Sequence, residues 1–333
     1  MTALTLAVLA VLLAWPVPVV LGRARWVHRA PAAAMVLWQA VALSGGMAMI
    51  GTPLAWGLAP FGDTLQTAAP AALDTTDRDG WLQLLIADDL GPARIAAVTL
   101  ALILTVHLVL TLGVTAVRTL RERHRHRRLV ELLADPDGRS RLDTAPLTRG
   151  TRVLPHDAPV AYCLPGLIGG VTVVSRGLLE QLSEAEVGAV VAHERAHVLQ
   201  RHDLLRLAFD AWNRAFPWLP TTRVAQRAVS SLTEMLADDA ALRGHRRADL
   251  ISAISLTGGS RKGPSEETSS GPVPTRQRTA QPTEDAGGEA VPLTPRLYRL
   301  LSPTAPLPVY GRAGIVVASV LLATAPAGLL LTG

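Results

Sequence analysis

Two histidines and a glutamate form a His-Glu-x-x-His pattern at positions 193, 194 and 197. On a helix, His193 and His197 lie one turn apart on the same face, so both imidazoles can bind one metal ion. Glu194 stands between them, close enough to polarise a metal-bound water. The pattern therefore predicts the site of a zinc peptidase, with the two histidines as zinc ligands and Glu194 as the general base.

The sequence before this pattern predicts a buried helix. Ser183 and Glu186 have the spacing of a capping box, which places a helix start ahead of His193. Residues 187–192 include no polar side chain, and a helix that is apolar on every face must be buried. Buried imidazoles and a buried carboxylate need polar partners, which favours a metal site over two incidental histidines on an exposed helix.

A third protein ligand is expected elsewhere, because catalytic zinc usually has three protein ligands and one water. Glu234 is the candidate, on a second predicted helix that begins after Thr222 and ends at Gly244. Asp238 follows one turn later on the same face, where it can accept the free N–H of a ligand histidine. The apolar neighbours of the two carboxylates favour a packed helix over a solvated one. The lone Cys163 cannot build a thiolate zinc site.

The His-Glu-x-x-His and later Glu-x-x-x-Asp motifs resemble those of the gluzincin metallopeptidases. Residues 161–203 resemble the integral-membrane branch of that clan, which includes the beta-lactam-sensing antirepressor peptidases and, more distantly, the heat-shock and prenyl-protein membrane peptidases. The resemblance is strong over residues 161–241 and implies an α+β zincin-like domain that holds one Zn²⁺ per chain. The matching positions make His193, His197 and Glu234 the zinc ligands, Glu194 the base, and Asp238 and, less directly, Asp203 acidic residues that support the ligands.

Two strands are predicted ahead of the zinc helix, at residues 160–163 and 171–174, each bounded by proline or glycine. Peptidases of the resembled kind bind a substrate as an added strand, pairing backbone to backbone. The resemblance therefore implies that a substrate pairs with an open edge formed by Val171, Thr172, Val173 and Val174.

The composition indicates a membrane protein. Hydrophobic residues make up 49% of the chain against 18% charged residues, and the mean hydropathy of +0.29 is high for a soluble protein. Four apolar stretches are long enough to cross a bilayer, at residues 3–21, 32–58, 95–117 and 313–331. The predicted fold class is a mainly α integral membrane protein with four transmembrane helices and an α+β zincin-like peptidase domain with a small sheet.

The composition also changes along the chain and indicates four regions. We expect a three-span membrane region at residues 1–118, in which the acidic residues 60–93 form a polar loop, and a zinc peptidase domain at residues 119–257. Residues 258–295 are rich in small and polar residues and poor in large apolar ones, which predicts a disordered linker. Residues 296–333 are expected to form a short helix and the fourth span.

A run of arginines from Arg118 to Arg128 follows the third predicted span directly. A basic run and a pI near 10.2 can indicate nucleic-acid binding, but this position is typical of a cytoplasmic anchor beside anionic lipid. No direct nucleic-acid binding is expected. The arginines near all four spans fall on one side of the bilayer, which predicts a multi-pass cell-membrane protein with a cytoplasmic peptidase domain and both termini outside.

The sequence thus predicts a membrane-bound zinc endopeptidase that cuts proteins or peptides at the cytoplasmic face. Its order of spans is similar to that of the antirepressor peptidases, so a cytosolic transcriptional repressor is a candidate substrate and self-cleavage in the linker a candidate activating step. The chain stops at Gly333 without the penicillin-binding domain of those sensors, so direct beta-lactam sensing is not expected. Two alternatives remain open: a housekeeping peptidase for membrane-protein quality control, and a non-catalytic receptor or scaffold with a structural zinc site.

Overall fold

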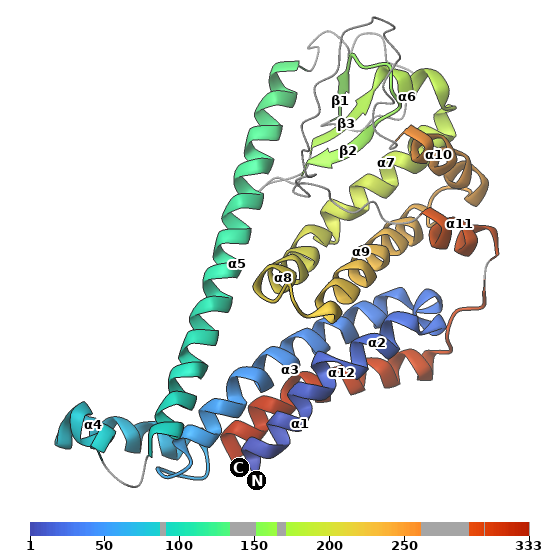
Figure 1. Ribbon diagram of the computed structural model, residues 1–333. Coiled ribbons are helices and arrows are strands. Elements are labelled where there is room, and N and C mark those ends of the chain that lie inside the picture. Colours follow the sequence, from blue (N-terminus) through green and yellow to red (C-terminus); the bar gives the residue numbers. More distant parts are fainter. Residues whose placement is uncertain (87–90, 134–150, 165–170, 261–292, 303, 333) are drawn as a thin grey trace, which may run out of the picture. The chain divides into compact units, whose positions relative to one another are not determined.

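The computed structural model describes residues 1–86, 91–133, 151–164, 171–260, 293–302 and 304–332 (Figure 1). They form two compact units. Unit 1 comprises Met1–Arg125, Arg201–Leu236 and Thr304–Gly333, and unit 2 comprises His126–Gln200 and Ala237–Pro303. The described part of the chain is mostly helical with one small sheet, which confirms that part of the predicted fold class.

Unit 1 contains the long apolar helices. Within the described residues, four helical segments are long and apolar enough to cross a membrane: Thr2–Arg23, Pro31–Leu58, Gly91–Arg125 and Val309–Thr332. They coincide with the four predicted stretches. The elements that lie wholly or mainly in this unit are α1 (Thr2–Ala14), α2 (Pro16–Arg23), the 3₁₀ turn η1 (Arg25–Arg29), α3 (Pro31–Leu58), α4 (Leu65–Ile86), α5 (Gly91–Leu133), α8 (His202–Ala215), α9 (Pro220–Ala241) and α12 (Val309–Thr332).

The first apolar segment breaks at Trp15, between α1 and α2, directly before Pro16 and Pro18. Pro18 has no N–H to donate to the Ala14 carbonyl one turn earlier, so that carbonyl needs another partner. The Thr221 hydroxyl, in the first turn of α9, donates to it. The helix that carries Glu234 therefore starts at this break in the first apolar segment.

Apolar packing fixes α9 further along its length. Val229 and Leu232 of α9 are buried in one cluster with Trp38 of α3 and Phe209 of α8. Since α3 is a candidate span, the first part of α9 is held against the candidate membrane helices of unit 1.

The two chain ends lie at one end of unit 1 (Figure 1). Residues 1–3, several residues of 55–68, and Leu330 and Thr332 line one hollow there. At the opposite end of these helices, ahead of α3 and α12, the Arg29 Nε donates to the Ala305 carbonyl at 2.9 Å.

The predicted polar loop at residues 60–93 is wrong in its local structure, because α4 occupies Leu65–Ile86. Four of residues 68–72 are alanine, which has the highest helix propensity, and the helix continues through Pro70 between them. The acidic character of the segment favours solvent exposure, which is compatible with a helix as well as with a loop.

Unit 2 contains the sheet and the predicted zinc helix. Its elements are β1 (Thr151–Leu154), β2 (Ala161–Leu164), β3 (Val171–Ser175), α6 (Arg176–Gln181), α7 (Glu184–Leu199), α10 (Arg247–Ser260) and α11 (Leu293–Leu301). The strand order is β1-β3-β2, with β3 parallel to β1 and antiparallel to β2.

The topology corrects the predicted substrate edge. Val171, Thr172, Val173 and Val174 lie in β3, the central strand, and each pairs with β2, while β1 pairs along the other side. These residues therefore offer no open edge. Their apolar run is typical of a strand that is covered on both faces, and this signal does not distinguish a central strand from an edge strand. The edges of the described sheet are β1 and β2.

The predicted linker lies mostly outside the described residues, which omit 261–292. Helix α10 reaches Ser260 and α11 begins at Leu293, so each flanking helix enters the predicted linker by a few residues. Disorder between them stays a prediction.

The turn into α6 generates a stability prediction. The Gly177 N–H donates to the His156 carbonyl at 2.9 Å, and a Cβ at Gly177 would collide with the Asp157 carbonyl. Gly177→Ala should destabilise the protein by about 1–3 kcal/mol, because backbone must move. Gly244→Ala is the matched control, since a Cβ there meets nothing within 4 Å. Thermal unfolding of the purified variants measures the effect, and equal midpoints for the two would contradict it.

Candidate metal centre

Helix α7 forms as the sequence predicts. Ser183 and Glu186 make the capping box, with the Glu186 carboxylate accepting the Ser183 N–H at 2.7 Å. The apolar run buries Val187, Val190 and Val191 in a cluster with residues of β3, α6 and α10. This packing holds α7 in the middle of unit 2 and fixes the direction in which its last turns point.

The two histidines of α7 face each other. The Nε2 atoms of His193 and His197 are 3.2 Å apart, and the His193 side chain is 8% exposed. Two ligands of a tetrahedral zinc ion, each at 2.0–2.1 Å from the metal, would stand about 3.3 Å apart. The separation of the two nitrogens therefore fits a shared zinc ion.

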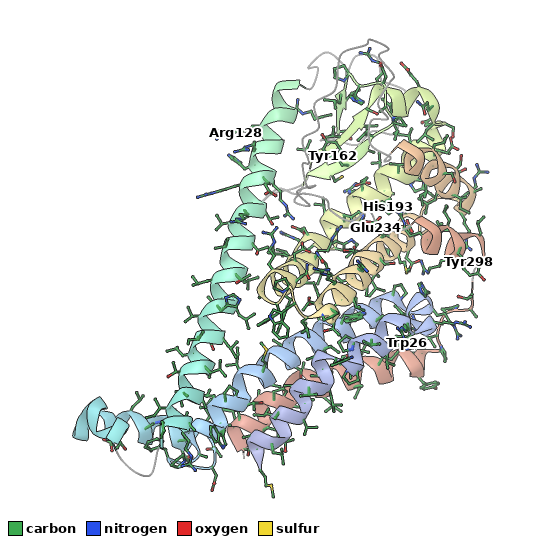
Figure 2. The ribbon with its side chains drawn as sticks, viewed as in Figure 1. Trp26, Arg128, Tyr162, His193, Glu234 and Tyr298 are labelled. Atoms are coloured by element: carbon green, nitrogen blue, oxygen red, sulfur yellow. The ribbon has the colours of Figure 1, made fainter. Side chains whose placement is uncertain are left out.

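Glu234 completes the group. His193, His197 and Glu234 each offer a ligand atom, and these atoms lie within 4.8 Å of one another. Figure 2 shows His193 on α7 and Glu234 on α9. Two imidazole nitrogens and one carboxylate oxygen form a donor set that suits zinc and leaves a fourth position for water.

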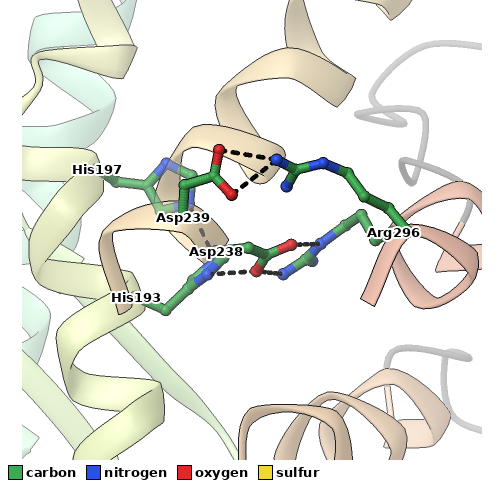
Figure 3. A network of polar contacts seen from close by, with 6 residues as sticks. His193, His197, Asp238, Asp239 and Arg296 are labelled. Carbon is green, nitrogen blue, oxygen red and sulfur yellow. Dashed lines mark hydrogen bonds and ion pairs between the residues drawn. The ribbon is translucent and has the colours of Figure 1, made fainter. Parts of the chain in front are cut away.

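Asp238 lies behind His193 (Figure 3). Its Oδ1 is 2.9 Å from the His193 Nδ1, which leaves Nε2 for the metal, and its side chain is 1% exposed. Burial acts most strongly on the pKa of Asp238 and raises it. Hydrogen bonds from His193 and Arg296, together with the positive charge of these partners, outweigh that effect, so the pKa lies below its ordinary value. Asp238 is thus placed as the sequence predicts.

Arg296 of α11 is the residue that sequence reasoning missed. Its Nε and Nη2 donate to Oδ2 and Oδ1 of Asp238, at 3.0 and 2.7 Å. It lies 58 residues beyond Asp238, so no local pattern joins the two. The sequence hints at this contact only through charge: α9 has two adjacent aspartates, and a later segment has two arginines three residues apart, Arg296 and Arg299.

Asp203 does not join the other predicted residues. Its Oδ2 accepts a hydrogen bond from the Arg123 Nη1 at 2.6 Å. Asp203 is in the first turn of α8 and Arg123 is in the arginine run of α5. Within the described part of the chain, this pair is the contact that the structure assigns to Asp203, so its predicted role behind a zinc ligand is not supported.

Glu194 is partly buried on α7 and near β2. Burial raises the pKa of the Cys163 thiol, on β2, to about 11, and the negative charge of Glu194 adds to the rise, while a hydrogen bond with Thr172 opposes it. The predicted base and an edge strand of the sheet are therefore close enough to interact electrostatically.

The comparison with protein families agrees with this geometry. Residues 120–230 match the model of peptidase family M48. This part of the chain is thus similar to the M48 peptidases, which are metallopeptidases and typically zinc-dependent. The match includes both histidines and Glu194 but ends before Glu234, so the third ligand rests on the geometry. No similar curated protein and no similar solved structure were found.

Metal analysis tests the ligand set. We expect His193→Ala, His197→Ala and Glu234→Ala to lose zinc, because each removes one of three ligand atoms. Asp238→Asn keeps all three and should weaken zinc affinity by about 10- to 100-fold. Zinc content and competition with a chelator measure these effects on the purified variants. Full zinc content in Glu234→Ala would remove that residue from the set.

Proposed function

We propose that this protein is a membrane-bound zinc endopeptidase that hydrolyses peptide bonds of protein substrates at the cytoplasmic face. The convergence of His193, His197 and Glu234, with Glu194 beside the first histidine, is the observation that carries the proposal. The M48 match and the four apolar segments support the peptidase activity and the membrane location.

In the proposed reaction, zinc would lower the pKa of a water to about 7 and polarise the scissile carbonyl. Glu194 takes one proton from the attacking water as the C–O bond forms, and gives a proton to the amine as the C–N bond breaks. His193, His197 and Glu234 hold the metal, and Asp238 fixes the orientation of His193.

Glu194→Gln separates chemistry from metal binding. Glutamine has nearly the same size but cannot accept the proton, so the rate of peptide cleavage should fall by about 10²- to 10⁴-fold. Zinc content should stay at the wild-type level. The measurement is cleavage of casein by the full chain in lipid nanodiscs, with zinc analysis of the same sample. No cleavage by a zinc-loaded wild type would favour a structural zinc site in a scaffold or receptor, and active cleavage at equal rates by both proteins would remove Glu194 as the base.

The substrate should pair with β2 rather than β3. The Ser175 N–H donates to the Val160 carbonyl at 2.8 Å and the Val160 N–H donates to the Ser175 Oγ at 2.9 Å, so residues 160 and 175 occupy a hydrogen-bonded position of the strand pair. Such pairs alternate along antiparallel strands, so in the observed register the backbone of Tyr162 bonds to β3, whereas the backbone N–H and C=O of Cys163 point away from it. The short distance of 3.0 Å between the Cys163 Sγ and the Thr172 Oγ1 suits a non-hydrogen-bonded pair. Since β2 packs against α7, this edge lies next to the zinc helix.

Cys163→Pro tests this edge. Proline removes an N–H that β3 does not use, so the sheet should persist while an added strand loses one donor. We expect zinc content to stay at the wild-type level and casein cleavage to fall at least tenfold. Cys163→Ala, which keeps the N–H, is the matched control and should cleave like the wild type. If both variants cleave equally well, the substrate does not pair at Cys163.

The proposed orientation places the peptidase domain in the cytoplasm and both termini outside. The arginine positions support it, because arginines near span ends favour the cytoplasmic side. Arg23 ends α2, and Arg25 and Arg29 lie in η1 before α3, at the end of unit 1 opposite to the two termini and to residues 55–68. The termini and the start of the α4 segment therefore share one side of the bilayer in this proposal.

Reporter fusions measure the orientation. A phosphatase reporter that is active only outside the cytoplasm should be active after Ala71 and inactive after Ser270. The matched control is a reporter that is active only in the cytoplasm, which should give the reverse result at both positions. An external signal after Ser270 would contradict a cytoplasmic peptidase domain.

The proposed substrate is a cytosolic transcriptional repressor. The order of three spans, a peptidase domain and a fourth span supports this, since it is similar to the order in the antirepressor peptidases. The Glu194→Gln protein should bind such a repressor without cutting it. Capture of misfolded membrane proteins instead would favour a housekeeping peptidase.

A further inference from the structure

The carboxylate of Asp238 contacts Arg296 as well as the candidate metal ligand His193. Its Oδ1 faces both the His193 Nδ1 at 2.9 Å and the Arg296 Nη2 at 2.7 Å, and its Oδ2 accepts from the Arg296 Nε at 3.0 Å (Figure 3). Asp238 is 1% exposed and Arg296 is 5% exposed. The three side chains thus form one buried chain of contacts that ends at a candidate metal ligand.

Arg296 makes a two-point contact that controls orientation. A guanidinium fork that bonds to both oxygens of a carboxylate holds the two groups in one plane. The terminal torsion of an aspartate side chain otherwise has a broad range, so a carboxylate without the fork could turn its oxygens away from His193. A lysine would supply the charge but not the two parallel bonds.

We propose that Arg296 is a positioning residue of the metal centre. It holds Asp238 in the orientation that receives the His193 Nδ1–H, and so keeps the His193 Nε2 directed at the metal. This rests on the proposed zinc site. It makes α11 a part of that site, although α11 follows the M48 match and lies next to α12 in the sequence.

A neighbouring ion pair provides an internal control. Asp239 follows Asp238 on α9, and Arg299 lies about one turn after Arg296 on α11. The Arg299 Nη2 donates to both oxygens of Asp239, at 2.7 and 2.8 Å. This pair joins the same two helices but is more exposed, with side chains 18% and 38% accessible. The described contacts of Asp239 are with Arg299 rather than with His193. Loss of Arg299 should therefore loosen α11 without turning Asp238.

The first test is zinc affinity of the full chain in lipid nanodiscs, measured by chelator competition. Arg296→Gln should weaken zinc binding by about 10- to 100-fold, as expected when the group that supports a ligand is disturbed. Arg296→Lys should show a smaller loss, and Arg299→Gln should stay within about twofold of the wild type. An Arg299→Gln loss as large as that of Arg296→Gln would overturn the proposal, because docking of α11 alone would then explain both.

The second test asks whether Arg296 acts through Asp238. If it does, replacing Arg296 in an Asp238→Asn background should cause little further loss of zinc affinity, since the coupled residues are not additive. The same fold loss in both backgrounds would overturn the proposal. If Arg296→Gln does not fold, Arg296→Lys in the two backgrounds gives the same comparison. A wild-type chain that binds no zinc would instead refute the proposed function.

Discussion

The buried carboxylate of Asp238 is the contact on which the candidate site depends. A charge in a buried position is stable only where hydrogen bonds and opposite charge replace water, and Asp238 has both from Arg296, with His193 on its other side. This arrangement links α7, α9 and α11, three helices that are far apart in the sequence. Removing any one member leaves the others buried without their partner, so the three residues act as a unit.

Helix α9 carries Asp238 and is itself held in place by contacts along its length. Its first turn meets the broken end of α1 through Thr221, and its buried residues Val229 and Leu232 pack against α3 and α8. Glu234 and Asp238 follow on the same continuous helix, one turn apart. The two carboxylates are therefore fixed relative to each other by helical geometry, and only the distant contacts of each one depend on other elements.

Local patterns predicted much of the fold and of the site. The capping box at Ser183, the spacing of His193 and His197, and the apolar stretches are properties of neighbouring residues, so the sequence displays them directly. The central position of β3 and the contact of Arg296 depend on pairing between distant segments, which no local pattern encodes. Asp203, a position carried over from a family resemblance, is paired with Arg123 in this chain, and its role as a support of the zinc ligands stays a prediction.

The most direct test of the account is X-ray absorption spectroscopy of the zinc-loaded protein, because it reports the atoms bound to the metal. The account predicts one zinc per chain with two imidazole nitrogens and oxygen ligands from Glu234 and water, at about 2.0–2.2 Å. A sulfur neighbour at about 2.3 Å, which only Cys163 or a methionine could supply, or a third imidazole, would contradict it.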